Sequence, residues 1–195
     1  MAPSTETLTA ERILEATEEV LRRHGPAKAT VVDVARALGV SHGSVYRHFR
    51  TKTALREAVT QRWLDRTCQA LAGTAAEDRD PEARLRDWIR GLAEAKRRKA
   101  ADDPELFATY GVLAGENREV VAAHLVDLIA QLTSIVEAGV ATGAFTTPDP
   151  EATARAVFEA TSSFHDPRHA TEWQRPGIDE EFTTLVDLLV RGLRA

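Results

Sequence analysis

The sequence contains few of the features that mark secreted or membrane proteins. It has a single cysteine, Cys68, so no disulfide can form within the chain, and a reducing compartment is the simplest expectation. The first residues, MAPSTETLTAERILEA, place acidic side chains before any long apolar run, unlike a secretory signal. The most apolar stretch, VVAAHLVDLIAQL, is interrupted by His124, Asp127 and Gln131, which argues against a membrane span. These features predict a soluble, cytoplasmic protein without a membrane partner.

The chain also lacks a strong overall charge, but its charges are unevenly distributed. The formal net charge of the 195 residues is −5, and 28% of them are charged. Residues 26–62 hold seven Lys and Arg against two Asp and Glu, whereas the remainder is acidic. A short basic segment joined to a longer acidic one is typical of a polyanion-binding head and a separate body. A solvated basic face would give the same charge balance, so charge alone does not distinguish it from a polyanion-binding segment.

Apolar residues recur with helical spacing along nearly the whole chain, and no strand-like alternation competes with it. We therefore predict an all-α fold, with a three-helix N-terminal domain followed by a helical bundle. Residues 1–50 are assigned to the first domain and 51–195 to the second, with a helix over 51–73 connecting them. The polar segment 73–81 is the best candidate for a boundary. Further helices are expected near 82–101, 104–114, 117–142, 150–165 and 179–194.

Residues 30–49, TVVDVARALGVSHGSVYRHF, have the spacing of a helix-turn-helix. Thr30 and Asp33 form a capping-box pattern at the start of the first helix. Gly39 suits the tight turn, and Ser41 can cap the second helix. In such motifs the second helix enters the major groove of DNA. This segment therefore predicts a DNA-binding function.

The second helix of this motif carries side chains suited to DNA. Its first turn is small and polar, which lets the backbone approach the duplex and its amides face a phosphate. The following residues offer donors to phosphates or base edges, and Lys52 can neutralise a further phosphate. The candidate DNA-contacting residues are Thr30, Ser41, His42, Gly43, Ser44, Tyr46, Arg47, His48 and Lys52.

This segment resembles the DNA-binding domain of the TetR/AcrR transcriptional regulators. The family pattern here is G-V-S-x-G-x-[LVI]-Y-x-[HY]-F-x-x-K-x-x-L. Its fixed positions are met by Gly39, Val40, Ser41, Gly43, Val45, Tyr46, His48, Phe49, Lys52 and Leu55. The specific resemblance covers roughly residues 9–56, and the remainder agrees in helix count and length.

The resemblance implies a dimeric repressor that binds a palindromic operator in double-stranded DNA. It also implies that a small molecule, expected to be apolar, enters the C-terminal body and causes release from DNA. No cofactor is implied, and the chain is not expected to be an enzyme. The resemblance also favours dimerisation through the last two long helices of the body.

These last two helices suit an interface between two copies. One carries small residues that allow close backbone approach, and the other carries a broad apolar stripe. The stripe could also belong to the core of a single chain, which is the less favoured interpretation. The candidate interface residues are Ala156, Ala160, Phe182, Leu185, Val186 and Leu189.

A ligand pocket is expected among the helices of the body, because pockets in helical bundles are apolar with few polar anchors. Each candidate could also be an ordinary core residue. The candidates are Trp88, Leu92, Phe107, Tyr110, His124, Leu128 and Phe158.

An all-α metal-sensing or enzymatic module is the alternative interpretation. It would use His124, His165 and His169, but Pro167 interrupts the helical spacing that a zinc-binding pair of histidines needs. We therefore predict no metal site. Residues 39–43 also match G-x-S-x-G, yet a hydrolase elbow requires a preceding strand, where this sequence predicts a helix.

Overall fold

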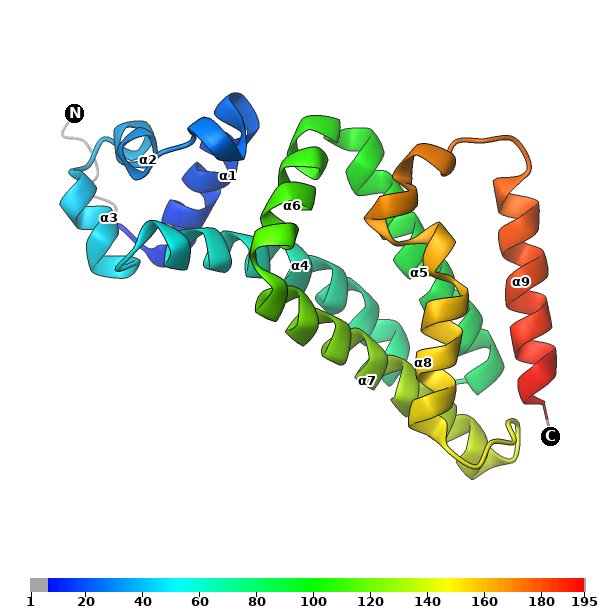
Figure 1. Cartoon of the computed structure of the whole chain (residues 1–195). Helices are drawn as coiled ribbons and strands as arrows, with labels where there is room; N and C mark the ends of the chain where they lie inside the picture. Colours follow the sequence, from blue (N-terminus) through cyan, green and yellow to red (C-terminus); the bar gives the residue numbers. More distant parts are fainter. Residues whose placement is uncertain (1–6, 195) are drawn as a thin grey trace, which may run out of the picture. The chain divides into compact units, whose positions relative to one another are not determined.

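A computed structural model describes residues 7–194, and this part of the chain is helical except for its turns (Figure 1). The all-α prediction is confirmed. The helices are α1 Ala10–Lys28, α2 Val31–Leu38, α3 His42–His48, α4 Lys52–Ala76, α5 Pro81–Asp102, α6 Pro104–Glu116, α7 Arg118–Thr142, α8 Pro150–Ala160 and α9 Ile178–Leu193, with short 3-10 helices η1 Ser162–Phe164 and η2 Pro167–Glu172 before α9.

The chain divides into two compact units. The head unit contains the residues up to Trp63 together with Asp103–Val121, and the body unit contains Leu64–Asp102 and residues 122–195. The long helices α4 and α7 each run from one unit into the other. The sequence-based division at residue 50, which separates a DNA-binding domain from a regulatory domain, stays a prediction. The compact units differ from it because α6 packs on α1.

The local signals of the helix-turn-helix act as the sequence predicts, and a glycine also breaks the helix before it. Helical geometry in α1 breaks at Gly25, whose φ of 69° lies in the left-handed region that favours glycine. Thr30 and Asp33 form both hydrogen bonds of the capping box. Gly39, with φ of 67°, closes α2, and the Ser41 side chain accepts a hydrogen bond from the backbone N–H at the start of α3.

The head unit extends beyond the N-terminal domain because α6 is fastened to α1 and α4. The ring of Tyr110 stacks on that of Trp63, with their centroids 4.4 Å apart. The Tyr110 hydroxyl donates to the carbonyl of Val59 at 3.3 Å. Arg22 of α1 pairs with Asp103, the capping residue of α6, at 2.7 Å. Stacking and ion pairs therefore join segments far apart in the sequence.

The body unit is built around a core from the end of α4 and from α5, α7, α8 and α9. Trp88 is fully buried, and its indole N–H donates to the Gln131 side chain at 2.9 Å. Gln131 in turn donates to the carbonyl of Cys68 at 3.1 Å. Other core residues are Leu71, Leu85, Ile89, Leu92, Leu128, Leu132, Ile135, Phe145, Ala154, Val157, Phe158, Val186 and Val190.

One predicted helix boundary is wrong. The helix expected over 150–165 ends at Ala160, and two 3-10 helices follow it. Thr161 bonds back to the carbonyls of Val157 and Phe158, and the ring of His165 also reaches the Phe158 carbonyl, at 3.2 Å. These side chains satisfy the last carbonyls of α8, so the helix ends there.

Helix α7 is more apolar along its length than the sequence analysis implied. Its 25 residues are long and apolar enough to cross a membrane by length and composition, even though His124, Asp127 and Gln131 interrupt them. The core helix of a soluble protein passes the same test, and one face of α7 packs inside the body unit. Its buried residues are His124, Leu128, Ile129, Leu132, Ile135, Val136 and Gly139.

Candidate nucleic-acid interface

Helices α2 and α3 form the helix-turn-helix predicted from the sequence. The turn between them is tight because the N–H of Val40 bonds to the carbonyl of Ala35 at 3.0 Å. Val34 and Val45 are buried and fix the two helices on each other and on their neighbours. The motif therefore has a rigid apolar inner side.

The outer side of α3 is polar and exposed, as a surface that reads DNA must be. The candidate residues of α3 and its cap lie on this side except Ser44, which is half-buried. The rings of His42 and Tyr46 meet edge to face, with centroids 6.3 Å apart. Arg47 donates to the Ser44 hydroxyl at 3.1 Å, which holds its guanidinium along the helix. The exposed residues are Ser41, His42, Gly43, Tyr46, Arg47 and His48.

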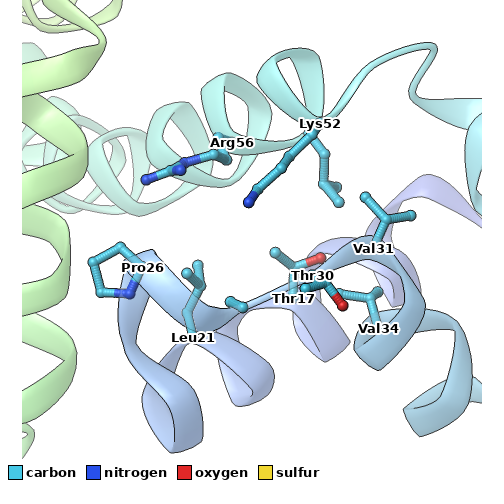
Figure 2. Close-up of a pocket in the computed structure, with 10 residues that line it drawn as sticks. Thr17, Leu21, Pro26, Thr30, Val31, Val34, Lys52 and Arg56 are labelled. Carbon is cyan, nitrogen blue, oxygen red and sulfur yellow. The ribbon is translucent and has the colours of Figure 1, made fainter.

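The remaining candidates, Thr30 and Lys52, lie at the starts of α2 and α4. Both line a small pocket of about 20 Å³ in the head unit, and Figure 2 shows the Lys52 side chain extending from α4 toward Thr30. That volume holds about one water molecule. The Thr30 hydroxyl bonds to Asp33 at 2.6 Å and is thus engaged in capping. The fold thereby brings together two residues that the sequence places 22 positions apart.

The predicted ligand-binding residues are divided between the two units. Phe107 and Tyr110 belong to the head unit, where both rings contact Trp63. Five others are buried in the body unit. In the part of the chain that the structure describes, neither the pocket of Figure 2 nor the open groove along α8 is lined by any of them. These five are Trp88, Leu92, His124, Leu128 and Phe158.

The three histidines of the metal-sensing or enzymatic alternative lie apart from one another in the contacts that the structure shows. His124 contacts Cys68, with Nδ1 and Sγ 3.2 Å apart. His165 lies beside Thr161 and Phe158, and the exposed side of His169 faces Glu172 at 3.8 Å. Within residues 7–194 no three His, Cys, Asp or Glu side chains gather in a way that could hold a metal ion.

The predicted interface residues occupy different environments. Ala156 and Ala160 are exposed on α8, next to the groove that runs along that helix. Leu185 and Leu189 are half-buried on α9. Phe182 is also half-buried, and its ring contacts that of Phe164 at 5.1 Å. Val186 is buried in the core of the body unit.

The structure gives two residues surroundings that the sequence did not predict. Leu188 is 59% exposed on α9, because that helix turns its neighbour Val190 inward. Lys96 lies in the charged run AKRRKAAD, which reads as a solvated face, yet only 6% of it is exposed. A signal was present, since Trp88, Leu92 and Lys96 are spaced by four and so share one helix face.

Comparison with known proteins identifies the class of protein that this geometry defines. Residues 13–59 match the family described as "Bacterial regulatory proteins, tetR family". Residues 81–186, more than half of the chain, match "Tetracyclin repressor-like, C-terminal domain". The helix-turn-helix head and the helical body thus define a transcriptional regulator rather than an enzyme. The chain belongs to the TetR family, as its motif suggested.

Individual relatives agree with this assignment. An uncharacterized HTH-type transcriptional regulator of Mycobacterium tuberculosis is 32% identical over 124 residues, which cover 60% of this chain and 59% of the relative. The chain thus spans about three fifths of the length of that relative.

Solved structures share the fold. SmeT, the repressor of the Stenotrophomonas maltophilia multidrug efflux pump SmeDEF, gives a TM-score of 0.71 at 20% identity, over 97% of this chain and 92% of SmeT. FadR of Bacillus subtilis, solved with stearoyl-CoA, gives 0.68 at 18% identity, over 95% of this chain and all of that chain.

Proposed function

We propose that this chain is a homodimeric repressor that acts in the cytoplasm. It binds a palindromic operator in double-stranded DNA through the two copies of α3 and leaves the DNA when a small molecule binds the body unit. Family membership supports the regulatory role. SmeT, which shares the fold, is itself a repressor.

The observation that carries the proposal is the exposed polar side of α3 on a rigid apolar base. We assign phosphate contacts, which position a protein on DNA, to the exposed residues Tyr46, His48 and Lys52. His42 and Arg47 are the side chains proposed to reach base edges, where an arginine can bind a guanine through two hydrogen bonds. Positioning is thus given to residues of α3 and the start of α4, and sequence reading to other residues of α3.

A dimer follows from the geometry of DNA recognition. One short recognition helix contacts a single half-site, whereas two copies related by a twofold axis contact half-sites a helical turn or a multiple apart. We assign the dimer contact to the exposed sides of α8 and α9. The small residues Ala156 and Ala160 would allow close approach, with Leu185, Leu188 and Leu189 supplying apolar area.

The effector is assigned to the body unit. Its buried apolar residues surround a few polar groups, the composition that small-molecule sites favour. FadR, solved with stearoyl-CoA, is a protein of this fold that binds a molecule with a long apolar chain. Effector binding can shift the protein away from DNA only if it favours a conformation that does not fit the operator.

The experiment is a fluorescence anisotropy titration of the full chain against the DNA upstream of its own gene, followed by footprinting. We expect protection of a palindrome and a steep decrease of affinity with salt. Variants Tyr46→Ala and Lys52→Ala should bind less tightly, whereas Arg98→Ala, an exposed change in the body unit, should bind as the unchanged chain does.

Two results would contradict the proposal. Unchanged affinity in the double variant of Tyr46 and Lys52 would remove the assigned contact surface. Protection of a single half-site by a monomer would remove the dimer.

A further inference from the structure

Three buried titratable side chains of the body unit, together with the half-buried Cys68, are not used by the proposed DNA contacts. They come from different segments: Cys68 from α4, Lys96 from α5, His124 from α7, and His165 from the stretch between η1 and η2. The exposed fractions of Lys96, His124 and His165 are 6%, 2% and 4%. Burying polar groups in a core costs free energy unless they are hydrogen-bonded or paired.

His124 has a hydrogen-bonding atom without a partner. Its Nδ1 lies 3.2 Å from the sulfur of Cys68, whereas its Nε2 is fully buried and makes no hydrogen bond in the structure. Burial raises the pKa of Cys68 to about 11, with Asp127 and Asp65 adding to the effect. The protonated thiol can donate to Nδ1, and we assign this direction, which places the proton of the neutral ring on Nε2. A buried N–H donor without an acceptor results.

Lys96 supplies a positive charge to the same region. Burial lowers the pKa of His124 to about 3 and that of His165 to about 4, and the charge of Lys96 acts in the same direction on both rings. Lys96 itself loses hydration by burial, which lowers its pKa to about 8. At neutral pH the ammonium is still mostly protonated, beside two rings kept neutral. The surroundings of His124 are therefore electropositive, through Lys96 and Lys99, and its ring holds a donor that lacks its acceptor.

We propose that the body unit binds a small apolar carboxylate whose head group lies between His124 Nε2 and the ammonium of Lys96. One carboxylate oxygen accepts from the imidazole N–H and the other faces the cation, so the two oxygens match the two donors. The inference rests on the proposed function in one respect, because this ligand is taken to be the effector.

The surroundings favour an apolar remainder on that ligand. Cys68 packs against the core that contains Trp88, Leu92, Leu128 and Phe158. The irregular segment after α8 contacts α5 through η2, and its 3-10 turns have weaker hydrogen bonds than an α-helix. Opening of this segment gives the ligand a route to Lys96. Carboxylates also act on this region, Asp166 on Lys96 and His165, and Asp127 with Asp65 on Cys68. The charges that act on His124, in contrast, are those of Lys96 and Lys99.

The test is calorimetric binding to the full chain without DNA. The probes are octanoate, octan-1-ol and octylammonium, which share one chain and differ in head-group charge, with 2-naphthoate as an aromatic carboxylate. We expect at least one carboxylate to bind about tenfold or more tightly than octan-1-ol, as a charge-assisted hydrogen bond requires. Octylammonium should bind most weakly, because the ammonium of Lys96 repels it.

Two variants and a control localise the head group. Lys96→Met should weaken carboxylate binding by about thirtyfold or more, since it removes the charge partner of a buried anion. His124→Phe should weaken it by about tenfold through loss of one hydrogen bond to a charged group. Arg98→Met removes a cation from the exposed side of the same helix and should change affinity by less than about twofold. Thermal unfolding of each variant checks that it is folded.

Several outcomes would overturn the inference. They are failure of both carboxylates to bind, equal binding of octan-1-ol, or unchanged carboxylate binding in folded Lys96→Met and His124→Phe. Operator binding by the unchanged chain is measured in parallel. If the chain binds its operator but no carboxylate, the ligand class is wrong and the DNA-binding function stands. If it binds the carboxylate but no DNA, the site stands and the repressor function fails.

Discussion

The head and body units use polar side chains in opposite ways. In the head unit the polar groups of α3 are exposed on a helix whose other side is anchored by Val45. In the body unit Lys96 and His124 are buried among apolar residues. An exposed group can be replaced with little effect on folding, whereas a buried charge changes the free energy of unfolding. Substitutions in the two units should therefore have separable effects.

The largest expected effect comes from the surface that joins two copies. Leu188→Glu places a carboxylate in the proposed interface and should give a folded monomer. Operator affinity should fall by about 100-fold or more, because the second half-site is no longer held at high effective concentration. Analytical ultracentrifugation and anisotropy measure the two consequences.

Val126→Glu is the matched control for this change. Val126 is 64% exposed on α7 and lies outside the proposed interface, so the variant should remain dimeric. An unchanged chain that sediments as a monomer at micromolar concentration would contradict the assignment of the interface.

The next largest effect is on the free energy of unfolding and comes from Lys96. Its dependence on pH distinguishes this buried lysine from exposed lysines. Because burial lowers the pKa of Lys96 from 10.5 to about 8, the folded state binds fewer protons than the unfolded state between these values. The charged form is thus destabilising below about pH 8, and the free energy of unfolding should rise with pH above it. Lys96→Met should stabilise the protein at pH 7 by up to about 3 kcal/mol.

Urea unfolding of both proteins at about pH 7, 8 and 8.5 measures this difference. Cys68, with its raised pKa, acts in the opposite direction above about pH 9, so the comparison is made below that value. A Lys96→Met variant less stable than the unchanged chain at pH 7 would mean that the contacts of Lys96 outweigh its burial.

The head unit should respond in binding rather than in stability. Lys52→Ala should weaken binding to all DNA sequences and reduce the slope of log affinity against log salt by about 1. Arg47→Ala should instead reduce discrimination at one base pair, by about 1–3 kcal/mol. Neither change should alter the free energy of unfolding by more than about 0.5 kcal/mol, because both residues are exposed. A panel of operator variants titrated at several salt concentrations separates the two roles.

The smallest expected effect is the acid sensitivity of the body unit. The pKa of His165 is lowered to about 4 by burial, so the ring stays neutral in the folded state while the unfolded chain gains a proton below about pH 6.5. Each such histidine therefore leaves the free energy of unfolding unchanged above about pH 6.5. Below that pH it lowers the free energy of unfolding by about 1 kcal/mol over the first pH unit. His165→Gln should reduce this loss in urea unfolding between pH 7 and 5. If the variant shows the same dependence of stability on pH as the unchanged chain, His165 does not cause the acid sensitivity.

The extent to which the sequence predicted the structure differs between the units. In the head unit the signals are local, such as Thr30 with Asp33 and the glycine of the turn, and each produced the expected helix end. In the body unit periodicity predicted most helices, but α8 ends five residues before the expected boundary. Its end depends on Thr161 and His165 folding back on the helix, which no propensity encodes.

The candidate sites show the same contrast. The DNA-contacting residues follow from spacing within one motif, and the structure exposes most of them on one helix. The ligand candidates came from apolar character alone, and the structure divides them, with Tyr110 in the head unit and Trp88 in the body unit. Apolar character predicts that a side chain is buried, but it does not identify the core to which the side chain belongs.

By itself the sequence determined the helix-turn-helix, because capping, tight turns and i, i+4 spacing act over a few residues and need no distant partner. The tertiary structure alone decided that α6 packs on α1, that Val186 faces inward while Leu188 faces outward, and that the core encloses Lys96. Each of these depends on contacts between segments tens of residues apart. An amphipathic helix specifies which side is apolar, whereas the segment that covers that side is selected only when the whole chain packs.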